Sequence, residues 1–172
     1  MTFIKISELN PKKMPSPDIE TAYQAWGVWC NGQPMPKWNN TDLFDIPARL
    51  IPYTAVLDVV NNPLDFVYRF WGTSLANIHH KEMKGHSVND IRPHEIAQNA
   101  KKSYNEIWQQ AKPSIRSHSY VWQDEDAIED FILRLPISDN GKDVDKIITI
   151  IDTPVQYAAY QESLNKPPEA HC

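Results

Sequence analysis

Aromatic and β-branched residues occupy nearly every position of the stretch DFVYRFWGT, residues 65–73, and predict a β-strand that ends at a glycine turn. Strict alternation places large rings on both faces of this strand, with Tyr68 on one face and Trp71 on the other. A strand with rings on both faces has to be covered on both sides. We therefore expect the rest of the fold to be organised around it.

One charged side chain interrupts this apolar strand. Arg69 keeps its charge in any environment and, if it is buried, needs a carboxylate, a carbonyl group or a ligand as its partner. Asp58 and Asp90 are candidate partners along the chain. The pattern leaves two interpretations open, a structural ion pair and a ligand contact.

The spacing of apolar residues predicts two amphipathic helices. The first has Ser16 as its N-cap and Pro17 at its first position, and it runs to Cys30. The second covers His94–Ala111 and ends before a proline. Shorter apolar clusters in residues 74–91 indicate two or three short helical turns.

Runs rich in β-forming residues and bounded by turn signals predict five strands, at residues 55–60, 66–71, 114–122, 128–137 and 146–153. Strands joined by tight turns pair antiparallel, and the helices between the second and third strands then make the chain an α+β protein. Residues 1–15 have the composition of a polar lead-in, and the tail after Pro154 has a helical pattern over residues 157–164. Residues 31–52 contain several prolines and form an ordered connection, which Phe44 and Leu50 hold against the fold.

Charge and cysteine content narrow the choice of partners and compartment. The chain of 172 residues has a formal net charge of −5 and no long run of Lys and Arg, which argues against nucleic acid and an anionic membrane as partners. Cys30 and Cys172 are too few for a disulfide framework or a zinc site. The sequence has neither a signal-peptide pattern nor a run of about 18 apolar residues, so we expect a cytoplasmic protein.

Several short motifs follow one another in a fixed order. They are Gly32-Gln33-Pro34-Met35-Pro36, Asp42-Leu43-Phe44-Asp45-Ile46-Pro47, Leu50-Ile51-Pro52, Leu57-Asp58-Val59, Tyr68-Arg69-Phe70-Trp71-Gly72-Thr73, and Leu133-Arg134-Leu135-Pro136-Ile137 with Gly141. In their order and spacing these motifs resemble a subfamily of free-standing, single-domain bacterial PAS proteins. The resemblance covers residues 18–153.

The resemblance implies a PAS fold, a five-stranded antiparallel sheet with a helical clamp between strands 2 and 3, here with an extra N-terminal amphipathic helix. Residues 1–53 would then hold the N-terminal helix and the proline-punctuated connection, residues 54–153 the PAS core, and residues 154–172 a C-terminal tail. PAS domains often enclose a cavity between the sheet and the long helix. The resemblance thus implies a sensor in signal transduction that binds a small molecule.

The candidate ligand-binding residues lie on the strands and the long helix that would enclose this cavity. They are Tyr68, Arg69, Tyr104, Trp108 and His118. If Arg69 and His118 converge inside the fold, they could hold a small anion or carboxylate. Aromatic residues at these spacings more often form plain hydrophobic core than line a pocket.

The sequence argues against the cofactors that PAS relatives use. His86 and His94 are candidate axial ligands for haem, but His94 lies at the very start of its helix. The flavin photochemistry of related light sensors uses a cysteine in the helical clamp, and no cysteine lies between residues 31 and 171. Adjacent His79 and His80 diverge by about 100° on a helix and make a poor metal pair. The cofactor is therefore unknown, and no metal site is expected.

Three functions are compatible with these features. The first is a non-enzymatic cytoplasmic sensor that binds a small metabolite and regulates an unidentified signalling protein. The second is a ligand-free interaction adaptor or homodimerisation module that docks through Trp26 and Trp29 of the N-terminal helix, residues that otherwise pack on the sheet. The third is a small enzyme on the same framework, but the chain has no Gly-x-Ser-x-Gly, phosphate-binding glycine loop or His-Glu-x-x-His. We expect no enzymatic activity.

Overall fold

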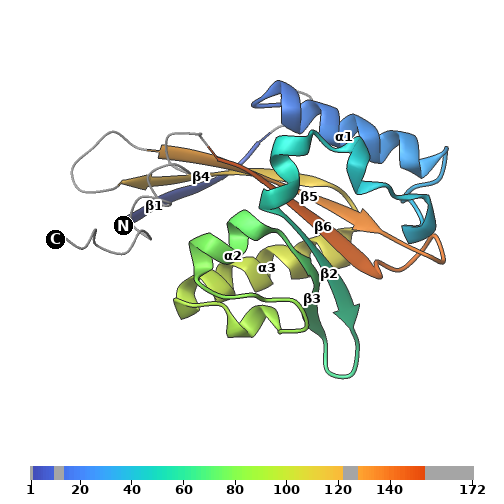
Figure 1. Ribbon diagram of the computed structural model, residues 1–172. Helices are drawn as coiled ribbons and strands as arrows, with labels where there is room; N and C mark the ends of the chain where they lie inside the picture. The colour runs from blue at the N-terminus through green and yellow to red at the C-terminus, as the bar shows by residue number, and fades with distance from the viewer. Residues whose placement is uncertain (1, 10–13, 122–127, 154–172) are drawn as a thin grey trace, which may run out of the picture.

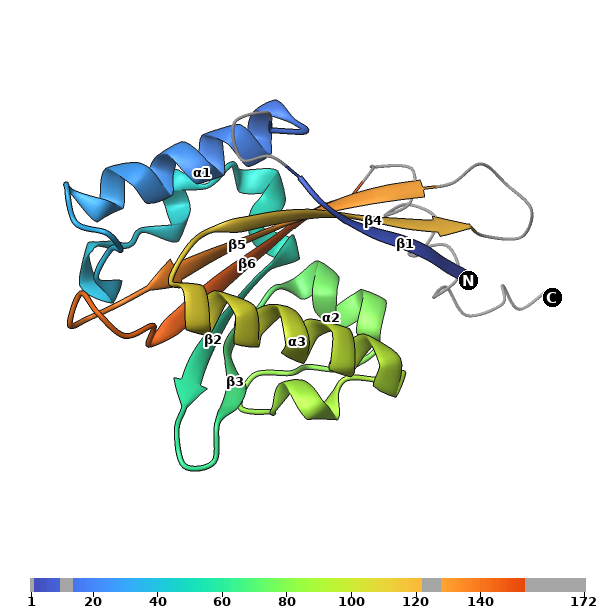
Figure 2. The same cartoon turned by 180° about the vertical axis from the view of Figure 1, so that it is seen from behind.

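The computed structural model describes residues 2–9, 14–121 and 128–153, and it shows an α+β protein with one antiparallel sheet (Figure 1). Six strands pair in the order β1-β4-β5-β6-β2-β3. Their bounds are β1 Thr2–Glu8, β2 Thr54–Val60, β3 Asp65–Trp71, β4 Ser114–Val121, β5 Ile128–Ile137 and β6 Lys146–Asp152. Helix α1 covers one face of the sheet, and helices α2 and α3 cover the other (Figures 1 and 2).

The helices begin where the sequence signals predicted. Their bounds are α1 Pro17–Cys30, α2 Thr73–His79 and α3 His94–Gln110, with short 3-10 helices η1 Trp38–Asn40, η2 Leu43–Asp45, η3 Ala48–Tyr53 and η4 Val88–Asp90. At the N-cap of α1, Ser16 Oγ accepts a hydrogen bond from the Ile19 backbone N–H at 3.2 Å. The connection between β3 and β4 carries α2, η4 and α3, so the predicted group of helices in this connection is confirmed.

The sheet has one strand more than predicted. Residues 2–8, predicted to be a polar lead-in, form β1 and pair with β4, from Thr2 opposite Val121 to Glu8 opposite Arg116. Alternating polar and apolar residues in this segment suit an edge strand, but its partner lies far along the chain. The expected count of five strands is therefore wrong, and the range 1–53 contains a strand as well as α1.

A β-bulge changes which side chains of β3 share a face. Val56 pairs with Phe70 and Leu57 with Tyr68, so Arg69 is the extra residue of the bulge. The bulge turns Trp71 to the face of Tyr68, where the two rings meet edge to face with centroids 4.6 Å apart. Strict alternation placed these two rings on opposite faces, and that prediction is wrong.

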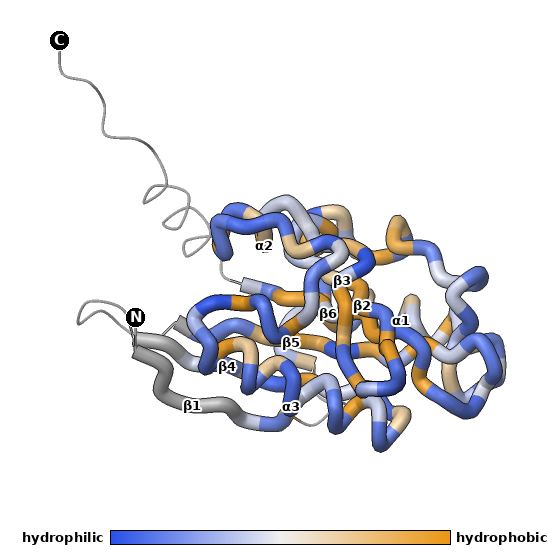
Figure 3. The backbone as a smooth tube through the Cα atoms, turned by 90° about the horizontal axis from the view of Figure 1, so that it is seen from below, coloured by the Kyte–Doolittle hydropathy of each residue, from blue (hydrophilic) through white to orange (hydrophobic). Residues whose placement is uncertain are grey.

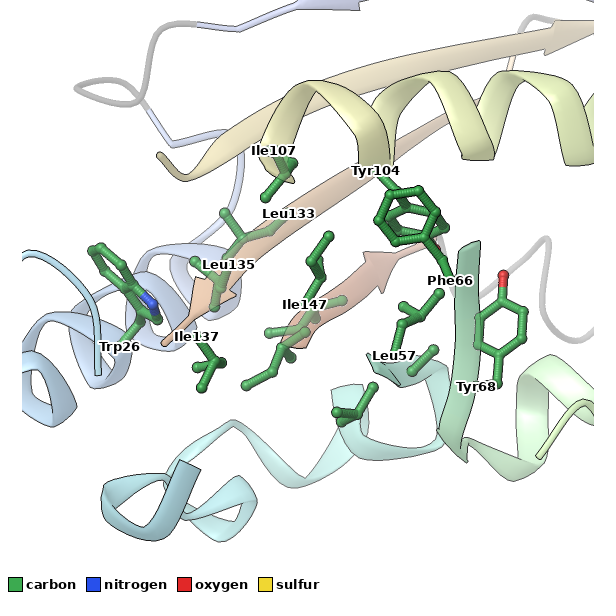
Figure 4. Close-up of a cluster of buried hydrophobic side chains, with 14 of the residues drawn as sticks. Trp26, Leu57, Phe66, Tyr68, Tyr104, Ile107, Leu133, Leu135, Ile137 and Ile147 are labelled. Atoms are coloured by element: carbon green, nitrogen blue, oxygen red, sulfur yellow. The ribbon is translucent and has the colours of Figure 1, made fainter. Parts of the chain in front are cut away.

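Apolar residues concentrate along the central strands (Figure 3). Trp26 and Trp29 of α1 belong to this core and are only 8% and 4% exposed. Trp26 Nε1 donates to the Pro136 carbonyl at 2.9 Å, and Trp29 Nε1 donates to Asp45 Oδ2 at 2.8 Å. Figure 4 shows Trp26 reaching in from α1 on the side of Ile137. The prediction that these tryptophans pack on the sheet is therefore confirmed, and the alternative of a docking or dimer surface built from them is wrong.

The connection between α1 and β2 is ordered, as predicted, through its three 3-10 helices. Leu50 is fully buried, whereas Phe44 is 87% exposed, so Phe44 does not hold the segment against the fold as expected. Gly72 lies where β3 meets α2, and a Cβ there would come within 2.2 Å of the Pro52 carbonyl oxygen. This close approach requires glycine and joins the β3–α2 junction to η3.

The two edges of the sheet differ. The helical connection covers the outer edge of β3, because Tyr68 N–H donates to the His86 carbonyl at 3.0 Å and Gly85 N–H donates to the Tyr68 carbonyl at 2.7 Å. Strand β1 forms the opposite edge.

The predicted C-terminal tail, with its helical segment at residues 157–164, lies outside the described residues.

Candidate functional site

Several polar side chains lie on the face of the sheet that α3 covers. Arg134 on β5 pairs in register with Thr149 on β6. Thr149 Oγ1 donates to the hydroxyl of Tyr104 on α3 at 3.3 Å, and Arg134 Cζ lies 5.3 Å from the centroid of the Tyr104 ring. Figure 4 shows Tyr104 extending from α3 beside Phe66. Helix α3 therefore meets the sheet through a polar cluster as well as through apolar packing.

Arg134 is the cationic centre of this cluster. The residue is 3% exposed, and its neighbours Leu133 and Leu135 are buried. Among the described residues, neither Nε nor Nη1 of Arg134 has a hydrogen-bond partner. Burial lowers the pKa of Arg134, but a guanidinium stays protonated in proteins. The described residues thus leave two donor nitrogens of a buried cation unsatisfied, an arrangement that costs free energy.

The described side chains that act electrostatically on Arg134 bring no negative charge. They are Tyr104, Arg116 and Tyr68. Burial raises the pKa of Tyr68 well above its ordinary value, and Tyr104 adds to the effect, so the Tyr68 phenol is neutral. Arg116 is a second cation, which has its own partner because it forms an ion pair with Glu106 of α3.

His118 and Asp130 extend the polar surface along β4 and β5, where they lie opposite each other. Burial, together with the charges of Arg134 and Arg116, lowers the pKa of His118 to about 4. Burial raises the pKa of Asp130 to about 6, the neighbouring Thr153 side chain opposes the rise, and the charge of Asp152 adds to it. At neutral pH His118 is therefore uncharged.

The structure brings three of the five predicted ligand residues to this cluster. Tyr68 and Tyr104 interact with each other and with Arg134, and His118 interacts electrostatically with Arg134. Trp108 is partly buried against the core on α3. These three of the five predicted residues therefore lie in the cluster, on β3, α3 and β4.

Arg69 lies outside the cluster. Its side chain is 47% exposed, and its Nε donates to Asp58 Oδ1 at 2.8 Å, an ion pair with one of the two predicted partners. Strands β3 and β4 are four positions apart in the sheet, which corresponds to about 19 Å at ordinary strand spacing. Arg69 and His118 therefore do not converge.

Sequence reasoning missed Arg134, although the signal was present. An arginine within the apolar run FILRLPI, residues 131–137, is the same anomaly that drew attention to Arg69. The choice between the two depends on the bulge, which turns Arg69 outward, and on the regular register of β5, which keeps Arg134 facing α3. Neither feature is visible in the hydrophobic pattern.

A separate hollow of about 190 Å³ lies between α2 and the start of α3. Its lining residues are His79, Lys81, Met83, Asp90, Ile91 and Arg92. Ligand pockets usually measure about 300–1,000 Å³, so this hollow is small for a metabolite.

Within the described ranges no three His, Cys, Asp or Glu side chains are grouped as a metal site, and no described helix is long and apolar enough to cross a membrane.

Comparison with solved structures finds distant structural similarity. No family model matches the chain, and no curated protein matches it. The crystal structure of the Vibrio cholera VqmA–ligand–DNA complex is similar with a TM-score of 0.45 and 7% sequence identity. The alignment covers 78% of this chain and 62% of the VqmA chain. At this similarity the neighbour carries no conclusion about the function of this protein.

One expectation about partners needs correction. The net charge of this chain predicts that it has no nucleic-acid partner, whereas the neighbouring structure is a complex with DNA. Net charge is a sum over the whole surface, and phosphate contacts depend on local positive charge. The net charge of −5 therefore does not exclude nucleic acid, and that part of the prediction is withdrawn.

Proposed function

We propose that this protein is a non-enzymatic, cytoplasmic PAS sensor domain that binds a small molecule between the sheet and α3 and thereby regulates a partner protein. The arrangement of the elements supports the PAS assignment. Strands β2 to β6 form five adjacent antiparallel strands, with α2, η4 and α3 between the second and third of them. This is the order that the sequence motifs imply, with β1 and α1 added to it.

The buried polar cluster under α3 is the observation that supports ligand binding. Arg134 is 3% exposed, and the described residues leave its Nε and Nη1 without hydrogen-bond partners. Buried polar groups in folded proteins nearly always have partners, so unsatisfied donors at this depth support the proposal that a group binds there.

The same cluster offers a route from ligand to partner. Arg134 contacts Tyr104, and Arg116 contacts Ser103 and Glu106, so three residues of α3 are attached to the cationic surface of the sheet. A ligand at Arg134 would compete with or reinforce these contacts. If it binds one arrangement of α3 more tightly, it shifts the population toward that arrangement, which the partner protein then recognises.

Native mass spectrometry of the protein purified from its own host tests the proposal. We expect an additional mass under gentle conditions that is lost on unfolding, in the wild type and in the surface variant Arg69→Met. The additional mass should be absent from Arg134→Met. A wild type that carries no additional mass and responds to none of the carboxylates and amides tested below would contradict the proposal.

A second candidate is a ligand-free interaction adaptor. Two large apolar side chains support it, since Val28 on α1 is 75% exposed and Phe44 on η2 is 87% exposed. Such residues can serve as protein contacts, although single exposed apolar residues are also common. The adaptor predicts a mass without ligand and partner binding that is weakened by Val28→Glu or Phe44→Ser but not by Arg134→Met.

A further inference from the structure

The charges of the buried cluster do not balance within the described residues. Arg116 is neutralised by Glu106, and His118 and Tyr68 are uncharged at neutral pH. Asp130 lies four residues from Arg134 along β5, about 13 Å at ordinary strand rise, and is not among the groups that act on Arg134. One positive charge, that of Arg134, is left over.

We infer that the ligand is a small organic monocarboxylate whose carboxylate is bound by the guanidinium of Arg134. This inference rests on the proposed function, because it names the class of ligand for the same site. A carboxylate accepts hydrogen bonds from guanidinium nitrogens and supplies the missing negative charge. The hydroxyl groups of Tyr68 and Tyr104 lie close enough to interact with Arg134 and with each other, so they border the place where the carboxylate would bind.

The single positive charge of the cluster favours a monoanion over a neutral molecule or a more highly charged anion. A neutral ligand would leave the buried cation uncompensated, which is costly. A phosphate monoester carries about −1.5 to −2 charges at pH 7, so it would replace one buried excess charge with an excess of the opposite sign. A single carboxylate matches the single uncompensated guanidinium.

Thermal unfolding with matched pairs of compounds tests the inference. Acetate, propionate and butyrate are compared with acetamide, propionamide and butyramide at pH 7 and constant ionic strength, with sodium chloride and sodium phosphate as further controls. The proteins are the wild type, Arg134→Met, Arg134→Gln and the surface control Arg69→Met. At 100 times Kd we expect at least one carboxylate to raise Tm by about 5–10 °C in the wild type and in Arg69→Met. The amides, and every compound with either Arg134 variant, should give no shift.

The possible outcomes distinguish a wrong class of ligand from the absence of any ligand. An amide or chloride that acts as strongly as the carboxylates, a larger effect of phosphate, or a carboxylate shift that persists in both Arg134 variants would overturn the inference and leave the proposed function standing. If no compound acts, the bound molecule is released from host-purified protein and analysed. A released carboxylate supports the inference. A released cation or neutral compound overturns the inference but leaves the proposed function standing. No bound molecule overturns both proposals.

A variant that fails to fold does not weaken this test. The comparison of each carboxylate with its amide in the wild type needs no substitution, and Arg134→Gln keeps hydrogen-bonding capacity where Arg134→Met removes it. The surface variant Arg69→Met reports any general effect of losing an arginine, because Arg69 lies in an exposed ion pair.

Discussion

The guanidinium of Arg134 on β5 lies against the ring of Tyr104 on α3, with 5.3 Å between Cζ and the ring centroid. The face of an aromatic ring attracts a cation with about 0.5–2 kcal/mol, depending on how dry the site is. An unpaired ion in a protein interior costs several kcal/mol. The Tyr104 ring therefore offsets only part of the cost of burying Arg134, and a bound carboxylate would offset more of it.

Removing the buried charge should stabilise the protein when no ligand is present. In ligand-free protein we expect Arg134→Met to raise the free energy of unfolding by about 1–4 kcal/mol, because an apolar side chain of similar length replaces an uncompensated cation. Urea denaturation at pH 7 measures the change. A loss of stability of about 2 kcal/mol or more would mean that Arg134 is a structural residue with partners of its own.

The surface arginine should behave differently. Arg69→Met removes an exposed ion pair with Asp58, and such pairs contribute about 0–1 kcal/mol. We expect a change in unfolding free energy within this range. A double-mutant cycle with Asp58→Asn isolates the coupling between the two side chains, and a coupling above about 2 kcal/mol would contradict the exposed geometry.

The facing pair His118 and Asp130 should give opposite pH dependences. The pKa of folded Asp130 is raised to about 6, so its contribution to stability is fully present below its unfolded pKa and is lost as the pH rises toward 6. The pKa of folded His118 is lowered to about 4, so its contribution is present above its unfolded pKa and is lost as the pH falls toward 4. Between pH 4 and pH 6 the two contributions nearly cancel.

Single substitutions separate the contributions of Asp130 and His118 to the pH dependence of stability. Relative to the wild type, Asp130→Asn should gain about 2–3 kcal/mol between pH 4 and pH 7, because the variant does not pay for ionising a buried carboxyl group. His118→Gln should gain a similar amount in the opposite direction, as the pH falls from 7 to 4. Urea denaturation across this range measures both. Parallel curves for the variants and the wild type would show that neither group has a shifted pKa.

The tryptophans of α1 should matter for stability and not for self-association. Trp26 is 8% exposed and hydrogen bonded to the Pro136 carbonyl, and we expect Trp26→Ala to cost about 3–5 kcal/mol. Val28→Ala on the same helix is the control, since Val28 is 75% exposed and should change stability by about 0.5 kcal/mol or less. Light scattering after size exclusion would contradict this view if a folded Trp26 variant lost a dimer that the wild type forms.

Two glycines should respond to alanine in opposite ways. At Gly72 a Cβ would lie 2.2 Å from the backbone oxygen of Pro52, so Gly72→Ala should destabilise by about 1–3 kcal/mol. Gly27 lies within α1 and a Cβ there meets nothing within 4 Å, so Gly27→Ala should stabilise by about 0.5–1 kcal/mol. Thermal unfolding of both variants measures the two changes. If Gly72→Ala is as stable as the wild type, η3 must move to make room for the added methyl group.

Local sequence signals predicted most of the fold. Caps, prolines and hydrophobic spacing located α1, α3 and the strands β2 to β6 to within a few residues. Strand β1 was missed because its existence depends on pairing with β4, a contact between distant parts of the chain. Hydrophobic pattern describes what one segment can bury and not which remote segment will cover it.

The candidate site was predicted only in part, for a related reason. Tyr68, Tyr104 and His118 were found because polar or aromatic residues on neighbouring elements tend to meet inside a small domain. The hydrophobic pattern does not show that Arg69 points outward, because one bulged residue reverses the direction of the side chains around it. The bulge follows from the pairing of β2 with β3 and not from the residues of β3 alone. Burial of Arg134 could be recognised only once β5 lay between two neighbours.

Strand β1 has a practical consequence for anyone who shortens the chain. A protein that begins at Met14 would retain every element from α1 onward but would expose the backbone donors and acceptors of β4, which β1 now occupies. Uncovered strand edges recruit strands from other molecules. A trimmed form is therefore expected to self-associate or aggregate through β4, and any dimer observed with it would be a product of the trimming.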